Sequence, residues 1–360
     1  MNTVKENRGP REVSERGTSG ELRGVVRIGS RRSNLAMTQT GLIADRLRAM
    51  GHEVEIVEIV TEGDTNRAPL TQLGGTGIFA TAIRNALRDN RIDLTVHSLK
   101  DLPVAPAPGL TIAAIPARAD ARDALIARDG LTLGELPAGA VVGTGSPRRV
   151  AQLAALGLGL ETREIRGNID RRIDFVRGGE LDAIVLARAG MSRVGRLEEI
   201  TETIDPLQML PAPGQGALAL ELRSDDEALI EVVRQLDDAD TRAAVTAERA
   251  VLARLEAGCS APLGALAEVT EDVDGSLEIS LRAFVGRTDG TFDLRRSQTG
   301  PFDQPEQLGH DVAELLLADG ALDAFPSDEQ APEPTPGGLL PRDADPVTVH
   351  HPQAPRSVKK

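Results

Sequence analysis

The chain has 360 residues, of which 40% are hydrophobic, so it is long enough for two or three domains with buried cores. A net charge of −14 and an aromatic content of 2%, with neither Trp nor Tyr, argue against nucleic acid or an anionic membrane as the main partner. No apolar run approaches the length of a membrane span and residues 1–23 lack the apolar stretch of a secretory signal, so we expect a soluble cytoplasmic protein.

Strand and helix patterns alternate between two polar tails. Residues 1–23 are polar and residues 325–360 are rich in proline, so both are predicted to be disordered. Period-2 and short apolar patterns predict strands at 25–30, 52–60, 92–98, 110–116, 123–128, 141–144 and 181–187. Period-3.6 patterns predict helices at 33–50, 77–90, 146–156 and 168–179. The order of elements restarts near residue 140, which predicts an α/β protein with two similar βα halves.

In the first helix, the spacing predicts one apolar face made of five side chains. They are Leu35, Leu42, Ile43, Leu47 and Met50.

The last section has a different pattern. A long helix is predicted at 238–258, strands at 265–271 and 277–286 flank an Asp-Gly turn, and a helix follows at 305–320. This order predicts a small α+β domain. The chain's one cysteine, Cys259, follows its first helix, and the residue alone is compatible with a buried small side chain or with a nucleophile or attachment point.

Two strand-to-helix junctions resemble each other. In "RIGSRRSNLA" and "VGTGSPRRVAQL" a serine, Ser33 or Ser146, precedes the helix and neighbouring arginines lie at the junction. Free N–H groups at a helix start bind carboxylates and phosphates, and arginine grips such groups at two points. Residues 141–193 hold nine arginines against six acidic residues in an acidic chain. Solvated arginines beside capped helices would give the same pattern, but two matching junctions favour binding of a small anionic molecule.

The stretch "VHSLKDLP" follows a predicted strand, at the end where α/β proteins place site residues. It brings together His97, Ser98, Lys100 and Asp101, and Lys100 is the one lysine outside the two tails. Asp101 is a candidate acid, base or stabiliser of a cation. The glycine segment "GGTGIF" lacks the spacing and the lysine of a P-loop, so a phosphate-binding transferase is not favoured.

Eight segments in this order and spacing resemble the porphobilinogen deaminase family. They are "RIGSRRSNLA", "GGTGIF", "VHSLKDLP", "VGTGSPRR", "IRGNIDRR", "LDAIVLARAGMSR", "LPAPGQGALALELR" and "LEAGCSAPLG". The resemblance implies two domains like those of periplasmic binding proteins and a small C-terminal α+β domain. The implied boundaries are 24–117 with 216–237 for domain 1, 118–215 for domain 2 and 238–324 for domain 3. The segment around residues 214–223 is implied to return to domain 1.

The resemblance also implies a reaction and a cofactor. Four porphobilinogen molecules would be condensed with loss of ammonia onto a dipyrromethane attached to Cys259 by a thioether, and linear hydroxymethylbilane would be released by hydrolysis. Asp101 matches the family's catalytic acid. Arg31, Ser33, Arg166, Arg172, Arg193 and Gln215 match positions that contact the substrate. Ser98, Lys100, Thr144, Ser146, Arg148, Arg149 and Arg172 match positions that contact the cofactor. The implied partners are porphobilinogen and the growing polypyrrole, and the implied state is a monomer without nucleic acid, membrane or metal.

Two positions depart from the family pattern. Thr76 stands where many members have lysine, and Gly145 stands where many have serine. Neither change affects Asp101 or Cys259. A non-catalytic two-lobed protein that binds or senses an anion remains the alternative, and it would need neither of those residues. From sequence we also expect Arg149→Leu and Arg172→Leu to leave the fold intact, and we expect Arg249 to be a dispensable surface arginine.

Overall fold

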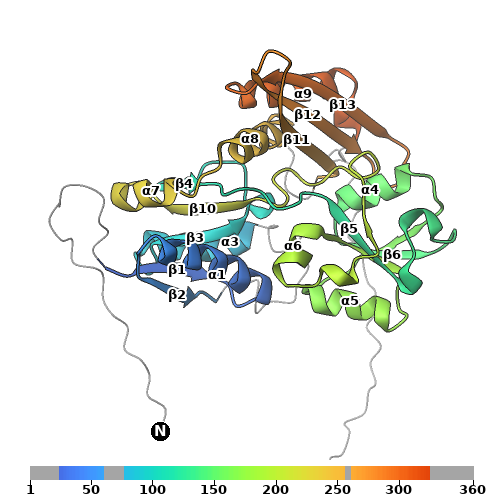
Figure 1. The fold of residues 1–360 in the computed structure, drawn as a ribbon. Coiled ribbons are helices and arrows are strands. Elements are labelled where there is room, and N and C mark those ends of the chain that lie inside the picture. Colours follow the sequence, from blue (N-terminus) through green and yellow to red (C-terminus); the bar gives the residue numbers. More distant parts are fainter. Residues whose placement is uncertain (1–23, 61–76, 256–260, 325–360) are drawn as a thin grey trace, which may run out of the picture. The chain divides into compact units, whose positions relative to one another are not determined.

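The computed structural model describes residues 24–60, 77–255 and 261–324 (Figure 1). Within these ranges the strands form two five-stranded sheets and one three-stranded sheet. This confirms the predicted α/β class. The expected tails, Thr76 in the glycine segment and Cys259 lie outside the described residues.

The first sheet has the strand order β2-β1-β3-β10-β4. Its strands are β1 (Val26–Ser30), β2 (Val54–Glu58), β3 (Leu94–Ser98), β4 (Leu110–Ala114) and β10 (Leu218–Arg223). Its helices are α1 (Asn34–Ala49), α3 (Gly77–Arg88) and α7 (Glu227–Arg234), and the short 3-10 turn η1 (Leu99–Asp101) follows β3. β1 pairs parallel with β2 and β3, whereas β10 lies antiparallel between β3 and β4. A strand from residue 218 onward thus completes the sheet that the N-terminal residues begin (Figure 1).

The second sheet repeats this arrangement with the order β7-β6-β8-β5-β9. Its strands are β5 (Asp123–Ala127), β6 (Val141–Gly143), β7 (Glu161–Arg163), β8 (Ala183–Ala187) and β9 (Glu202–Thr203). Its helices are α4 (Pro147–Ala155), α5 (Ile169–Arg177) and α6 (Arg188–Arg193), with 3-10 turns η2 (Arg128–Gly130), η3 (Leu133–Glu135) and η4 (Leu197–Glu199). Here β6 pairs parallel with β7 and β8, and β5 is antiparallel to β8 and β9. The predicted repetition of two similar halves is therefore seen in the strand order.

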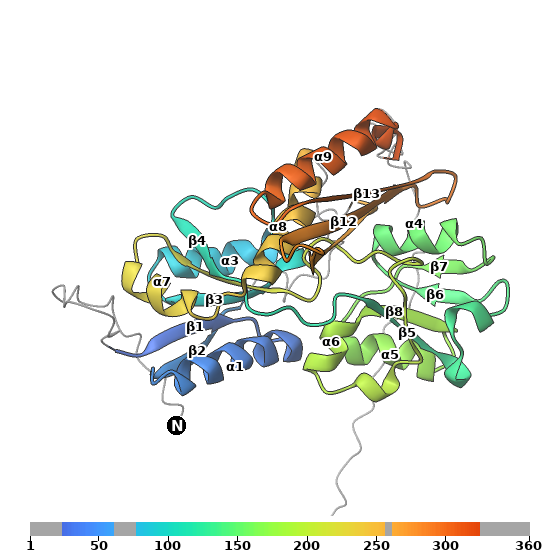
Figure 2. The same cartoon turned by 45° about the horizontal axis from the view of Figure 1, so that its top comes forward.

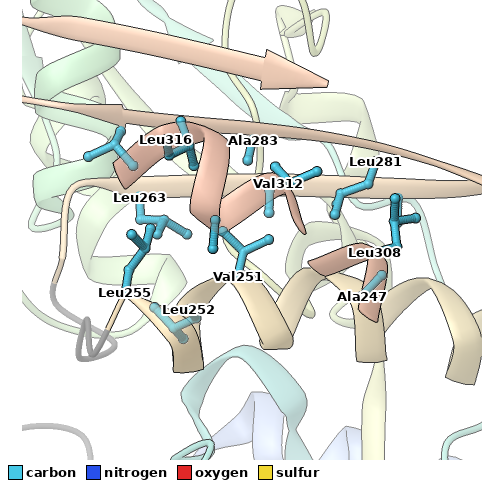
Figure 3. Packing of buried hydrophobic residues seen from close by; sticks show 14 of the residues in the cluster. Ala247, Val251, Leu252, Leu255, Leu263, Leu281, Ala283, Leu308, Val312 and Leu316 are labelled. Carbon is cyan, nitrogen blue, oxygen red and sulfur yellow. The ribbon is translucent and has the colours of Figure 1, made fainter. Parts of the chain in front are cut away.

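The third sheet is an antiparallel meander of β11 (Leu263–Glu271), β12 (Leu277–Gly286) and β13 (Asp293–Pro301). Helices α8 (Ala239–Arg254) and α9 (Pro305–Ala318) pack on it, and the turn η5 (Ala321–Ala324) follows (Figure 2). Figure 3 shows Val251 of α8 and Val312 of α9 meeting Leu281 and Ala283 of β12 in a buried cluster. Because all four side chains are fully buried, they exclude water from the space between the helices and the sheet.

One expectation about the first helix is wrong. Leu42 was expected on its buried face but is 47% exposed, because the buried residues are Gln39, Thr40, Ile43, Ala44 and Leu47 and position 42 lies away from them. Gln39 is buried because its amide donates to Ser98 Oγ at 3.0 Å on the neighbouring strand. The sequence analysis also missed six elements, which are β7, β9, β10, β13, α6 and α7. Of these, β10 and α7 do contain buried apolar residues. Strand β13 has the mostly polar sequence DLRRSQTGP and no fully buried residue, so it lacks the alternation of apolar and polar residues that predicts a strand.

The buried carboxylate of Glu248 on α8 joins three parts of the chain. Its side chain is fully buried, and both its oxygens accept from the Arg118 guanidinium, at 2.6 and 3.0 Å. It also accepts from Gly214 N at 2.6 Å and Ala267 N at 2.9 Å. Arg118 lies between β4 and β5, and Gly214 lies between β9 and β10, so Glu248 binds both segments that connect the first two sheets. The domain boundaries proposed from sequence remain a prediction.

We predict that Glu248→Ala costs about 3–5 kcal/mol of unfolding free energy, because it leaves a buried guanidinium and two backbone N–H groups without their acceptor. Urea denaturation at neutral pH measures this cost. The control is Glu314→Ala. This change removes an exposed carboxylate of α9 that pairs with Arg254 of α8, and it should cost at most about 1 kcal/mol of unfolding free energy. Equal midpoints for the two variants would contradict the role given to Glu248.

Candidate active site

The turn η1 places Lys100 and Asp101 directly after β3. Its flanking residues Leu99 and Leu102 are 0% and 1% exposed, whereas Asp101 is exposed and Lys100 is half-buried. Leu99 N donates to Ala217 O at 3.0 Å. Gly214 has a φ of +76°, and a Cβ there would lie 3.0 Å from Leu99 Cγ, so this close approach requires glycine. Two buried leucines thus fix the ends of a turn that presents a lysine and an aspartate.

Arg148 and Arg149 are buried rather than solvated. Arg149 Nη2 lies 2.8 Å from Asp123 Oδ1, and Arg148 Nη1 lies 2.8 Å from Asp123 Oδ2. Burial alone would raise the pKa of Asp123, but the two guanidinium groups outweigh it and hold that pKa well below its usual range. Gln215 Nε2 donates to the same carboxylate at 2.9 Å. The sequence analysis expects Arg149→Leu to leave the fold intact, but the structure shows that Arg149 compensates a buried charge, so we expect this variant to be less stable.

Positive charge gathers around η1. Burial lowers the pKa of Lys100, an effect that Asp101 opposes and Arg149 strengthens. Burial also lowers the pKa of Arg172. The charge of Arg149 lowers this pKa further, whereas the charge of Asp101 raises it. Among the described residues, the four cations Lys100, Arg148, Arg149 and Arg172 thus interact with two carboxylates, Asp101 and Asp123. A site with this excess favours an anionic ligand such as a carboxylate.

A cavity of about 240 Å³ opens beside Asp101. Its lining includes Arg31, Ser33, Gln39, His97, Ser98 and Asp101. Ser33 caps α1, since its side chain accepts from Ala36 N at 3.4 Å. The first of the two predicted junctions therefore lies in the same cavity as the candidate acid.

His97 has a different environment from its neighbours in the sequence. His97 Nε2 lies 3.1 Å from Glu221 Oε2 on β10, and the same carboxylate accepts two-point hydrogen bonds from Arg84 of α3. Gln39 was not singled out from sequence. The one signal in the sequence is its spacing, which places Gln39 on the same helix face as Ile43 and Leu47.

The second predicted junction has a different capping geometry. Ser146 occupies the N-cap position of α4 before Pro147, but its side chain makes no capping hydrogen bond there. Ser146 N instead donates to the side-chain oxygen of the buried Thr144 at 3.2 Å. At Gly145, where many relatives are expected to carry serine, a Cβ would lie 3.0 Å from Ile165 O. Added bulk at this position would therefore crowd the backbone that precedes Arg166.

Two more candidates, Arg166 and Arg193, lie among the elements of the second five-stranded sheet. Arg193 Nη2 donates to Gly216 O at 2.6 Å, and burial lowers the pKa of Arg193 to about 10. Arg166 is exposed and pairs with Glu164 at 2.7 Å. Among the interactions that the structure describes, neither arginine is linked to the cations around η1.

Arg249 was expected to be a surface arginine whose replacement does little, but the structure does not leave it as a free surface side chain. It is half-buried on α8, and its guanidinium donates to the carbonyl oxygens of Leu99, Leu102 and Pro103. The sequence pattern could not show this, because Arg249 lies 148 positions after Asp101 in the chain.

Two family models match the chain. "Porphobilinogen deaminase, dipyromethane cofactor binding domain" matches residues 26–231, and "Porphobilinogen deaminase, C-terminal domain" matches residues 242–318. The chain belongs to the porphobilinogen deaminase family.

Curated relatives agree with this assignment. A porphobilinogen deaminase of Mycolicibacterium gilvum is 58% identical over 304 residues, which cover 83% of this chain and 97% of the relative. One of Mycobacterium marinum is 55% identical over 313 residues, which cover 86% of this chain and 99% of the relative. Among solved structures, the VFT2 domain of Bordetella pertussis BvgS is 15% identical, covers 59% of this chain and 86% of that one, and has a TM-score of 0.37.

The described residues fit the family's dipyrromethane cofactor in their chemistry. The matching model is that of a cofactor binding domain, and the cations around η1 outnumber the carboxylates described near them, which suits a cofactor with acid groups. Arg148 also has a buried Nε for which the structure shows no hydrogen-bond partner. A buried donor of this kind suits an additional acceptor. No helix within the described ranges is both long and apolar enough to cross a membrane.

We predict that Arg149→Leu lowers the unfolding free energy by about 3 kcal/mol, because it removes charged hydrogen bonds to a buried carboxylate. Arg172→Leu is the matched comparison, since the hydrogen bond described for its side chain goes to Gly167 O at 2.9 Å. It should cost only about 1 kcal/mol. The pKa of Asp123 is lowered in the folded state, so its ion pair stabilises the fold fully at pH values above the ordinary pKa of 3.8. The difference in unfolding free energy between the parent and Arg149→Leu should therefore be largest there and should decrease as the pH falls below 3.8. Urea denaturation between pH 7 and pH 3 tests both statements, and equal deficits for the two variants would contradict them.

Proposed function

We propose that this protein is a hydroxymethylbilane synthase, a transferase that joins four porphobilinogen molecules with loss of ammonia and releases the linear tetrapyrrole by hydrolysis. The family assignment supports this, since the models of both family domains match the chain. The observation in the structure that carries the proposal is an exposed carboxylate, Asp101, on a fixed turn among excess positive charge.

Asp101 is proposed to be the catalytic acid and base. Its carboxylic acid form donates a proton to the aminomethyl group, so that the C–N bond breaks and ammonia leaves with the bonding electron pair. The carboxylate that remains stabilises the resulting methylene-pyrrolenine cation. After the new C–C bond forms at a pyrrole α-carbon, Asp101 accepts the proton that this carbon loses, which returns it to its starting state.

The dipyrromethane is proposed to be attached to Cys259, and when bound it supplies the pyrrole α-carbon to which the first substrate is joined. Lys100, Arg148 and Arg149 are the cations proposed to hold its acid groups. Ser98, Thr144, Ser146 and Arg172 complete that set. Each of the three cations interacts with Asp123 or Asp101. Their positions would therefore be fixed before the cofactor is assembled.

The substrate's acetate and propionate groups are proposed to bind a second set of residues. It consists of Arg31, Ser33, Arg166, Arg172, Arg193 and Gln215. Arg31 and Ser33 support this role because they line the cavity that also contains Asp101. Arg172 supports it because its charge interacts with Asp101. Each condensation adds two carboxylates, which explains why so many arginines would be needed.

We further propose the domain division 24–117 with 216–237, 118–215 and 238–324, and a monomer that works in the cytoplasm without nucleic acid or membrane partners. The strand order supports the first division, because β10 completes the sheet begun by β1. The net charge of −14 supports the expectation about partners. The alternative of a non-catalytic anion-binding protein is not favoured, since the chain belongs to an enzyme family and retains the matching aspartate and cysteine.

We predict that Asp101→Ala loses nearly all turnover and that Asp101→Glu keeps a small part of it, because a longer side chain displaces the carboxylate. Single-turnover assays with porphobilinogen on folded protein measure this. Asp89→Ala, which changes an exposed aspartate paired only with Arg91 within the described contacts, should keep parental turnover. An Asp101→Ala protein within about threefold of the parent would require a different catalytic acid.

We predict that Cys259 carries the dipyrromethane. Intact-mass measurement of protein made in a porphobilinogen-producing host should exceed the mass of the sequence by one dipyrromethane unit. In Cys259→Ser both the excess and the turnover should disappear, because a thiolate is the nucleophile able to form the thioether. A fully active protein with the unmodified sequence mass would refute the assignment.

A further inference from the structure

Arg249 of α8 binds the backbone of the turn that carries Asp101. Its Nη1 donates to Leu99 O at 3.2 Å and to Leu102 O at 2.9 Å, and its Nη2 donates to Pro103 O at 2.9 Å. The accepting carbonyls lie on both sides of Lys100 and Asp101. A planar guanidinium with several donors can hold such carbonyls in one fixed arrangement.

The turn η1 has few bonds of its own that could replace these. It is a three-residue 3-10 turn in which Leu102 N donates to Leu99 O at 3.1 Å, and Leu99 N donates to Ala217 O at 3.0 Å. Asp101 itself is exposed. Among the described contacts, its position is therefore set by the backbone that Arg249 binds.

On the side of η1 that faces α8, the buried side chains of Leu99 and Leu102 pack with Val245, but this packing does not fill all of the space. A cavity of about 440 Å³ lies there, and its lining includes Leu99, Pro103, Val104, Val245 and Arg249. Dense packing would hold a turn in place without hydrogen bonds, but a cavity allows it to shift. α8, in contrast, is held independently by the buried Glu248 and by the core around Val251. Loss of Arg249 should therefore move η1 more than it moves α8.

We propose that Arg249 is a positioning residue for the reaction, and that it acts by fixing the backbone on both sides of Asp101. The inference rests on the proposed function. It extends that function to a residue of the C-terminal family domain, which begins at residue 242, whereas Asp101 lies in the cofactor binding domain. The orientation of the catalytic carboxylate would then depend on contact between the two family domains.

The test compares Arg249→Leu and Arg249→Lys with Arg242→Leu. Arg242 is the matched control, because it lies on the same helix and also makes three hydrogen bonds, but to Asp237 and Ala113 O rather than to η1. The measurements are kcat and KM for porphobilinogen, the urea midpoint, and amide hydrogen exchange at Leu102. All variants are made as full-length chains in the same host, and dipyrromethane loading is checked by intact mass.

Arg249→Leu should lower kcat about 10- to 100-fold, because a displacement of the catalytic group by about 1 Å has effects of this size. KM should change by less than about threefold, since Arg31 and Arg172 remain in place. Leu102 should exchange faster, Arg249→Lys should recover part of kcat, and Arg242→Leu should stay within about threefold of the parent. If Arg249→Leu fails to fold, Arg249→Lys serves as the test variant, and a lowered kcat at a parental urea midpoint supports the proposal.

Three results would overturn the inference. They are parental kcat in Arg249→Leu, an equal loss in Arg242→Leu, or a raised KM with unchanged kcat. Each of them requires a parent protein that turns over porphobilinogen. A parent protein that has the unmodified sequence mass and converts no porphobilinogen would instead refute the proposed function. The two failures are therefore distinguishable.

Discussion

The described structure depends on one buried ion pair, between Glu248 and Arg118. A fully buried carboxylate is costly unless its oxygens are satisfied, and Glu248 accepts four hydrogen bonds from Arg118, Gly214 and Ala267. Two of these donors belong to the segments that connect the first two sheets, and the third belongs to β11. Because each of the three regions contributes a donor, none can move far from α8 without leaving a buried charge unpaired. The relation between both connections and the third sheet is thereby fixed by polar contacts rather than by apolar packing alone.

The same physical principle operates at Asp123 but serves a different purpose. Arg148 and Arg149 compensate its buried charge, and this compensation is the reason that two guanidinium groups can stay buried beside Lys100. Together with Arg172, these cations outnumber the carboxylates they interact with. A protein alone gains nothing from an excess of buried positive charge, since desolvation disfavours each cation. Such an arrangement makes sense when the missing negative charge arrives with a ligand, as the acid groups of a dipyrromethane and of porphobilinogen would.

Asp101 combines exposure with a fixed backbone. In the proposed reaction, the carboxylate would act on a chain that grows ring by ring, which requires an open position, yet a proton donor is effective only in a narrow range of positions. The structure meets both requirements by burying Leu99 and Leu102 on either side and by binding their carbonyls from α8. The side chain of Asp101 is thus exposed, while the main chain on either side of it is held by hydrogen bonds from α8.

The sequence by itself determined the α/β class and the repeated halves, because apolar periodicity is a local property, and it singled out Asp101 and its neighbours as candidates by their residue types. It predicted most of the long helices and strands, and it missed β13, whose residues alternate without any being fully buried. It also brought Arg31, Ser33, Ser98 and Asp101 together as candidates, and the structure places all four around one cavity. Only the tertiary structure could decide which arginines are free to bind ligand and which compensate buried carboxylates. The sequence suggests ligand binding for Arg149 and a surface position for Arg249. Their partners in the structure, Asp123 and the carbonyl oxygens on either side of Asp101, lie 26 to 150 positions away. Partners so far apart are set by the packing of whole elements, which no local pattern encodes.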